Sequence, residues 1–191
     1  MAKLKKPSIQ NILVVIVIIL LVIPQTRTAI QVAVNKVSMS VFSPKAYSSE
    51  DQIALSPFIY KVQDMKGNKR GVEVGSGKIT FVSYWATWCP PCIAEMPSIQ
   101  SLYDDYGNKI EFLLITNEDP EIVNKFISKK GYTLPSVNPL MNTPEQLFER
   151  SIPTNYLIDQ NGTVIMKEQG AADWNSQKVR DILDKLLVDN G

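Results

Sequence analysis

The segment from Lys78 to Gly107 constrains the fold more than any other part of the sequence. It begins with "KITFVSYW", a β-branched and aromatic run that is typical of a buried central strand. "ATWCPPC" follows at once, and apolar residues then recur at helical spacing until Gly107, a residue type that often ends helices. The sequence therefore predicts a strand that leads, through a turn containing Cys89 and Cys92, into a helix.

The rest of the chain continues this alternation of strand and helix patterns. A hairpin at Asn161 and Gly162 precedes a closing amphipathic helix. This order predicts an α/β fold with a mixed sheet, a parallel centre and helices on both faces. The predicted strands cover residues 58–62, 71–74, 78–85, 110–116, 136–141, 154–159 and 163–168, and the predicted helices cover residues 91–107, 120–131, 143–151 and 176–191.

The N-terminal region is basic and strongly apolar. Lys3, Lys5 and Lys6 precede "ILVVIVIILLVI" at residues 12–23, a run that is short for a membrane span of about 20 residues. The pattern fits a cleaved signal peptide or a retained signal anchor, and the lack of a clear small-residue cleavage site favours the anchor. The lysines favour a membrane-anchored protein with its catalytic domain on the extracytoplasmic, periplasmic side. We therefore predict an anchor or transmembrane segment at 1–28, a juxtamembrane segment and linker at 29–56, and a folded domain at 57–191.

Charge is divided unequally along the chain. Residues 1–49 hold six basic and no acidic side chains, whereas residues 50–191 hold 14 basic and 19 acidic ones. A folded domain with a net charge of −5 lacks the basic face that nucleic acids require. We therefore expect no nucleic-acid partner.

Cys89 and Cys92 are the only cysteines, and the chain has no histidine. A structural zinc ion needs four ligands, usually Cys or His, so this pair is a poor zinc site. A disulfide that only staples the fold would close a very small loop and stabilise it little. A redox-active dithiol fits better, because the N–H groups and positive dipole at a helix start favour a thiolate at Cys89. We expect no metal and no cofactor.

Several motifs resemble those of the thioredoxin-fold, membrane-anchored TlpA/ResA-like thiol–disulfide oxidoreductases. They are "YWATWCPPC", Pro97 after the second cysteine, and "SIPTNYLID" around Pro153. The resemblance covers roughly residues 57–191 and includes a β-α insertion, with the helix "PEIVNKFISKKGY", before the strand that follows Pro153. It implies a thioredoxin-like fold and an enzyme that exchanges disulfides with exported proteins. Cytochrome c maturation is the best-known task of this group.

The resemblance also implies roles for individual residues. Cys89 is expected to be the exposed nucleophile that forms a mixed disulfide with the substrate, and Cys92 the thiol that resolves it. The peptide bond before Pro153 is expected to be cis, which leaves the Ile152 backbone free to pair with a substrate strand. Trp85 and Trp88 are expected to shape the site by packing. The expected substrate-binding residues are Trp88, Pro90, Pro91, Ile152, Pro153 and Thr154.

Glu95 has two interpretations. It lies three residues after Cys92, so the two side chains share a helix face. In the resembled group an acid at this position is associated with the active site, where it disfavours a thiolate and can carry a proton. The alternative is a solvated surface glutamate. Ser83 stands where thioredoxin has a buried aspartate, so Glu95 is the better candidate for proton exchange, and we expect it to be catalytic.

Other functions could use the same dithiol. A peroxiredoxin-type peroxidase needs a Pro-x-x-x-Thr-x-x-Cys pattern. With Cys89 as its cysteine, Val82 stands at the proline position and Ala86 at the threonine position. A non-enzymatic copper or thiol-metal handler would bind through the two soft thiolates, yet no Met or His cluster accompanies them. A thiol oxidase or isomerase of the same fold is a further alternative.

The expected direction of electron flow is from this protein to its substrate. No histidine is present to stabilise a thiolate, and a less stabilised thiolate makes the dithiol a better electron donor. We therefore favour a protein-disulfide reductase. Such a donor must be recharged in an oxidising compartment, which implies a membrane oxidoreductase that delivers electrons.

Overall fold

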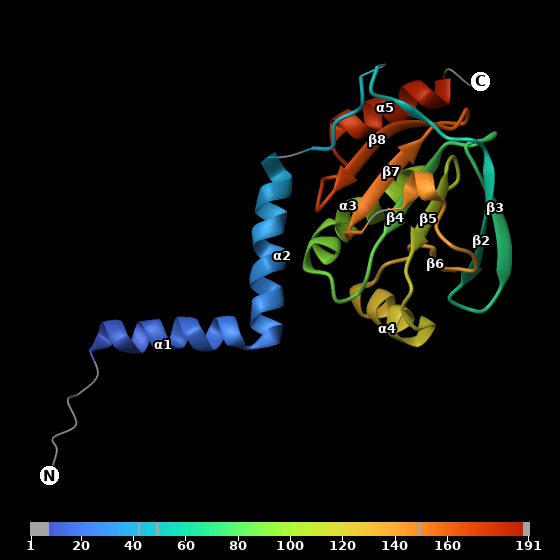
Figure 1. Ribbon diagram of the computed structural model, residues 1–191. Coiled ribbons are helices and arrows are strands. Elements are labelled where there is room, and N and C mark those ends of the chain that lie inside the picture. The colour runs from blue at the N-terminus through green and yellow to red at the C-terminus, as the bar shows by residue number, and fades with distance from the viewer. Residues whose placement is uncertain (1–7, 42, 49, 149, 189–191) are drawn as a thin grey trace, which may run out of the picture.

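The computed structural model describes residues 8–41, 43–48, 50–148 and 150–188. Its centre is an eight-stranded sheet of order β1-β8-β7-β4-β5-β6-β2-β3 (Figure 1). The strands are β1 (Ile53–Ala54), β2 (Phe58–Asp64), β3 (Lys69–Val74), β4 (Thr80–Tyr84), β5 (Glu111–Ile115), β6 (Ser136–Pro139), β7 (Thr154–Ile158) and β8 (Thr163–Gln169). The helices are α1 (Ile9–Val22), α2 (Pro24–Val41), α3 (Pro90–Tyr106), α4 (Pro120–Lys130) and α5 (Gln177–Val188), with one 3-10 turn, η1 (Glu145–Leu147).

The predicted mixed sheet is confirmed, with β4 at its centre. β4 pairs in parallel with β5 and antiparallel with β7, and β5 pairs in parallel with β6. β4, β5 and β6 are parallel, and they are neighbours in that order across the sheet. Because both connections move the same way across the sheet and are right-handed, α3 and α4 lie on the same face. Apolar side chains of α3, α4 and α5 pack there against Phe81, Phe112 and Leu157.

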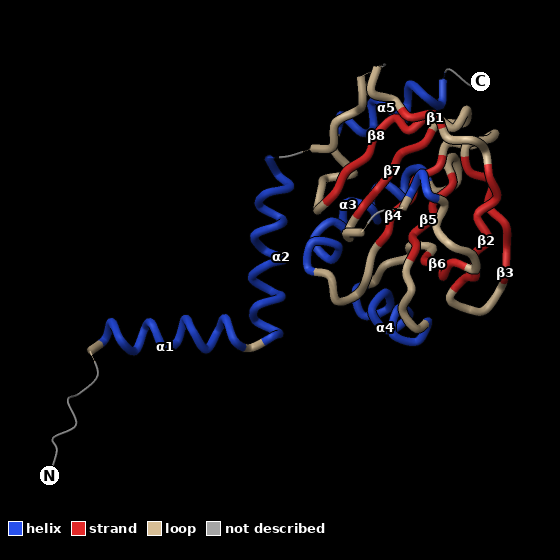
Figure 2. The backbone as a smooth tube through the Cα atoms, viewed as in Figure 1, coloured by secondary structure: helices blue, strands red, loops and turns tan. Residues whose placement is uncertain are grey.

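The opposite face differs from the prediction of helices on both sides. Its apolar cluster joins Val82, Leu113 and Tyr156 to side chains of the β2–β3 hairpin and to Leu147 of η1. The sheet curls, so the hairpin covers the surface where a second helical layer was expected (Figure 2). The helix predicted at 143–151 is reduced to the single turn η1, and the Thr143 hydroxyl lies 3.3 Å from that of Tyr60 rather than capping a helix.

The segment predicted as a linker lies partly along the sheet. β1 pairs with β8, and Ala46 forms an isolated bridge with Met166. Leu55 is buried in the second apolar cluster. Ala46, β1 and Leu55 therefore belong to the folded domain, although they precede its predicted start at residue 57.

The two N-terminal helices lead away from the sheet at an angle to each other (Figure 1). α2 packs against α3, whereas the side chains of α1 that the structure describes are exposed. Among the described residues, no helix is long and apolar enough to cross a membrane. Lys3, Lys5 and Lys6, on which the prediction of orientation rests, lie outside the described residues.

Candidate active site

The two cysteines lie where β4 gives way to α3. Cys89 is the N-cap of α3, and a disulfide joins it to Cys92 with their Cα atoms 5.3 Å apart. Pro90 and Pro91 fill the first two helical positions and have no N–H to donate. The Cys92 N–H is therefore the first free donor of the helix, and it points to Cys89 Sγ at 3.3 Å. This geometry supports negative charge on Cys89 through one backbone N–H group. A sequence without Pro90 and Pro91 would have two more N–H groups at this end of the helix.

The expectation that Cys89 is exposed is wrong for this disulfide form. Only 3% of Cys89 is exposed, and Cys92 is fully buried. The loop before Pro153 lies over the disulfide and brings Ile152 O to 3.7 Å from Cys89 Sγ. Cys89 is still the more accessible cysteine of the two, and the Ile152 carbonyl lies beside its sulfur.

The Ile152–Pro153 peptide bond is cis, as predicted. Pro153 itself is buried, and its carbonyl accepts a hydrogen bond from Gly170 N–H at 2.9 Å. Thr154 is also buried, and its hydroxyl donates to Ser151 O at 2.8 Å. Of the three residues predicted to bind substrate here, Ile152 is the one that reaches the surface.

The tryptophans of the motif lie in different environments. Trp85 is buried and packs on Phe126 with ring centroids 5.8 Å apart, as a packing residue should. Trp88 is 68% exposed, so packing does not account for it. Pro90 and Pro91 are half-buried beside Ile30 and Val34 of α2, which flank them on one side.

Glu95 is one of the most deeply buried polar groups of the domain, so the interpretation as a solvated glutamate is wrong. Only 1% of it is exposed. Asn155 Nδ2 donates to both carboxylate oxygens at 3.0 and 3.1 Å, and Ala172 N–H donates to Oε2 at 3.3 Å. Burial raises the pKa of Glu95 from 4.5 to about 8, against the lowering effect of these hydrogen bonds. A carboxyl group with such a pKa can both release and accept a proton near neutral pH.

A second acid, Glu118, was missed by the sequence analysis. Its carboxylate accepts hydrogen bonds from the Thr87 N–H at 2.5 Å and the Thr87 hydroxyl at 2.6 Å. Thr87 stands two residues before Cys89, so Glu118 fixes the turn that carries the nucleophile. Asn155 was missed as well. It directly precedes the apolar residues "YLI" in the same strand, and a polar side chain in such a strand is a signal that could have drawn attention to it.

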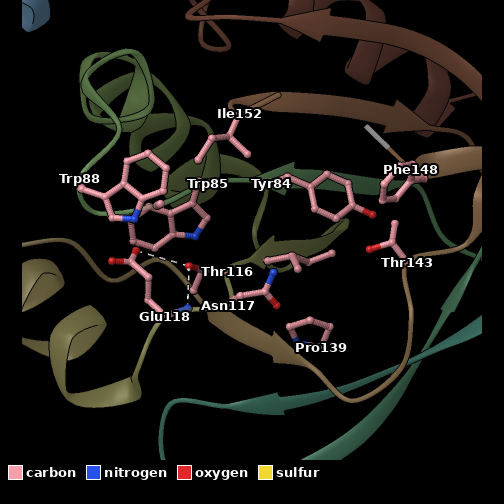
Figure 3. A pocket seen from close by; sticks show the side chains of 12 residues that line it. Tyr84, Trp85, Trp88, Thr116, Asn117, Glu118, Pro139, Thr143, Phe148 and Ile152 are labelled. Atoms are coloured by element: carbon pink, nitrogen blue, oxygen red, sulfur yellow. Dashed lines mark hydrogen bonds between the residues drawn. The ribbon is translucent and has the colours of Figure 1, made fainter. Parts of the chain in front are cut away.

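A cavity of about 380 Å³ opens beside the disulfide, between the carboxyl ends of β4 and β5 and the loop that precedes β7 (Figure 3). Trp88, which precedes Cys89 in the sequence, and Ile152, whose O lies 3.7 Å from Cys89 Sγ, line it together with Tyr84 and Phe148 (Figure 3). Glu118 adds a carboxylate, which is linked to the Thr116 hydroxyl at 3.4 Å. The cavity thus offers aromatic and aliphatic surface, with one negative charge, next to the reactive sulfur.

Comparison with known proteins found relatives in sequence and in fold. A "Thiol-disulfide oxidoreductase ResA" from Halalkalibacterium halodurans is 29% identical over 130 residues, which span 66% of this chain and 73% of the relative. A protein of the same name from Geobacillus kaustophilus is 33% identical over 111 residues, spanning 55% of this chain and 62% of the relative. The crystal structure of a DsbF homologue from Corynebacterium diphtheriae superposes with a TM-score of 0.57 at 19% identity, covering 78% of this chain and 94% of that one.

The structural likeness confirms the predicted thioredoxin-like fold. The family is given by the sequence itself, because the profile of the AhpC/TSA family matches residues 58–167, more than half of the chain. The chain belongs to the AhpC/TSA family, with the thioredoxin-like domain that its fold displays.

Proposed function

We propose that this protein is an extracytoplasmic reductase of disulfides in exported proteins, acting through Cys89 and Cys92. Its enzyme class is that of the relatives, whose names describe thiol–disulfide oxidoreductases. One observation carries the proposal: the disulfide lies at the N-terminus of α3, under the Ile152–Pro153 cis bond, with Cys92 N–H directed at Cys89 Sγ.

The first step is attack by Cys89. In the reduced enzyme its thiolate attacks one sulfur of a substrate disulfide, and the disulfide bond of the substrate breaks. The second substrate sulfur leaves as a thiolate and takes up a proton. A mixed disulfide now joins Cys89 to the substrate. The N–H of Cys92 favours the thiolate form of Cys89 that this attack requires.

The second step needs a base for Cys92. Its thiol is buried and must lose a proton before it can attack the mixed disulfide. Glu95 lies one turn along the same face of α3, and its raised pKa suits it to take that proton. Attack by Cys92 on the Cys89 sulfur breaks the mixed disulfide and releases the substrate sulfur that was bonded to Cys89 as a thiolate, which is protonated, and the Cys89–Cys92 disulfide seen here is restored.

The substrate chain is held by the surface around the cavity. Trp88 and Phe148 are large, exposed side chains, 68% and 59% accessible, and exposed aromatic residues are typical anchors of binding surfaces. Ile152 lines the same cavity, has its carbonyl oxygen 3.7 Å from Cys89 Sγ, and offers its backbone to an extended substrate. The partner is therefore an oxidised, locally unfolded segment of an exported protein, and the haem-site thiols of apocytochrome c are one candidate.

The direction of electron flow follows from the weak stabilisation of the Cys89 thiolate. Pro90 and Pro91 remove two backbone donors, and no histidine is available to add a positive charge. A thiolate with few stabilising partners favours the disulfide form of the enzyme, so the dithiol gives up its electrons readily.

The compartment and the electron donor are proposed from the N-terminal sequence. Three lysines precede the apolar run of residues 12–23, which supports retention at the membrane with the domain outside the cytoplasm. A membrane oxidoreductase then returns electrons to the Cys89–Cys92 disulfide.

The trapping of a mixed disulfide tests this function. A full-length Cys92→Ser variant, expressed in cells, should accumulate a covalent adduct through Cys89 that mass spectrometry can identify as an exported protein. The matched Cys89→Ser variant should trap far less. Equal trapping by both variants, or adducts with cytoplasmic proteins alone, would contradict the proposal.

A further inference from the structure

In every hydrogen bond that the structure shows at the Glu95 carboxyl group, the partner is an N–H donor and Glu95 is the acceptor. Asn155 Nδ2 serves both oxygens and Ala172 N–H serves one. This arrangement suits the carboxylate but leaves the hydroxyl of the carboxylic acid without an acceptor. Yet a group that exchanges a proton must be accommodated in both forms, and an unpaired buried hydroxyl is costly.

The other end of the Asn155 side chain supplies the missing acceptor. Its Oδ1 is buried and has no hydrogen-bond partner among the described residues. The side-chain amide is planar, and rotation by half a turn exchanges Oδ1 and Nδ2 within nearly the same volume. After that rotation Oδ1 faces the Glu95 carboxyl group.

Ser83 is the polar neighbour of Asn155 on the adjacent strand β4. It lies directly opposite Asn155 in the β4–β7 pairing, so both side chains are on the same face of the sheet. This is the face covered by α3, since Phe81 and Leu157 share it. The Ser83 hydroxyl is fully buried and, within the part of the chain described, also unpaired. In the orientation seen, Ser83 Oγ and Asn155 Oδ1 make no hydrogen bond to each other, and a hydroxyl is able to accept from Nδ2 once the amide has rotated.

We propose that Asn155 is a positioning residue whose side-chain amide rotates with the protonation state of Glu95. Nδ2 donates to the Glu95 carboxylate; when Glu95 holds the proton, Oδ1 accepts from its hydroxyl and Nδ2 turns toward Ser83. The proton moves only between the Cys92 thiol and Glu95, and Asn155 itself gains and loses none. The inference rests on the proposed function for the source of the proton, but not for the rotation.

The rotation gives both the charged and the neutral form of the buried Glu95 a hydrogen-bond partner, so Glu95 can change its protonation state inside the core. Glu168 on β8 raises the pKa of Glu95 through like charge. Cys92, three residues before Glu95 on α3, is joined to Cys89 in the oxidised protein and does not titrate there.

Among the described residues, hydrogen bonds rather than a positive group favour the charged form of Glu95: Asn155 has the largest such effect, and Ala172 and Trp174 add to it. A partner that could bond only to the carboxylate, or only to the carboxylic acid, would hold Glu95 in that one protonation state.

Nuclear magnetic resonance of the isotope-labelled full chain, oxidised and held in detergent micelles, tests the rotation. The carboxyl carbon of Glu95 reports its titration. Well above the midpoint, the Asn155 Nδ2 protons should show contacts to the Glu95 side chain. Well below it, the same protons should show contacts to Ser83 instead. In Glu95→Gln this change with pH should disappear.

Asn138 is the matched control in the same spectra. Its Nδ2 donates to Thr116 O at 2.7 Å and to Glu118 O at 3.0 Å, away from Glu95, so its contacts should not follow the titration. Asn155 contacts that stay the same across the Glu95 titration would overturn the proposal. Because no substrate is used, this result does not depend on the enzymatic activity, which the trapping experiment measures separately.

Discussion

Replacing Glu95 with glutamine should make the protein more stable at high pH than the wild type, and progressively so as the pH rises. The pKa of Glu95 is raised from 4.5 to about 8 by burial. Between these values the folded protein keeps a proton that the unfolded chain releases. The contribution of Glu95 to the free energy of unfolding therefore falls as the pH rises through this window, and it is constant on either side of the window. A shift of one pKa unit corresponds to about 1.4 kcal/mol, so the full effect is at most about 5 kcal/mol.

Urea unfolding of the oxidised full chain in detergent, followed by tryptophan fluorescence from pH 4 to pH 9, measures this effect. Glutamine keeps the shape of Glu95 but does not titrate. Subtracting the two stability curves therefore cancels every other ionisable group. The difference should grow in favour of Glu95→Gln across the window, whereas the exposed Glu121→Gln should retain the wild-type slope. A difference that is flat from pH 4 to pH 9 would refute the buried, proton-exchanging Glu95.

Three further predictions concern the surroundings of the disulfide. Limiting iodoacetamide should label Cys89 before Cys92 in the reduced protein, because Cys89 is the N-cap and the more accessible cysteine; preferential labelling of Cys92 by mass spectrometry would reverse the roles. Glu118→Ala should lower the free energy of unfolding by about 2 kcal/mol, since it removes both hydrogen bonds to Thr87; an unchanged urea midpoint would show that the turn holds without it. Trp88→Ala should raise the KM for an oxidised protein substrate while changing stability by less than about 0.5 kcal/mol, because the side chain is 68% exposed; an unchanged KM would remove Trp88 from the binding surface.

The strand–cysteine–helix unit could be predicted because its signals are local. Period and composition define β4 and α3, and Asp119, Pro120 and Gly131 mark the two ends of α4. The cis bond at Pro153 was found by resemblance to a motif. In each case the deciding residues are neighbours in sequence.

The features that were missed depend on residues far apart in the chain. Glu95 and Asn155 are 60 positions apart, and Thr87 and Glu118 are 31 positions apart. Only the register of β7 beside β4 brings Asn155 under α3. The burial of Cys89 likewise depends on the loop before Pro153, and the covering of the second face depends on the curl of the sheet. A local pattern can single out a residue such as Asn155, but it does not say which distant residue will be its partner.

The most direct test of the central claim is the reduction potential of the Cys89–Cys92 pair. The full chain in detergent is equilibrated against glutathione and dithiothreitol buffers, and the reduced fraction is read by thiol alkylation and mass spectrometry. The weakly stabilised Cys89 thiolate predicts a midpoint near that of thioredoxin, about −270 mV, rather than near that of a strong oxidant, about −120 mV. A midpoint more positive than about −160 mV on that scale would contradict a reductase and identify the protein as a thiol oxidase.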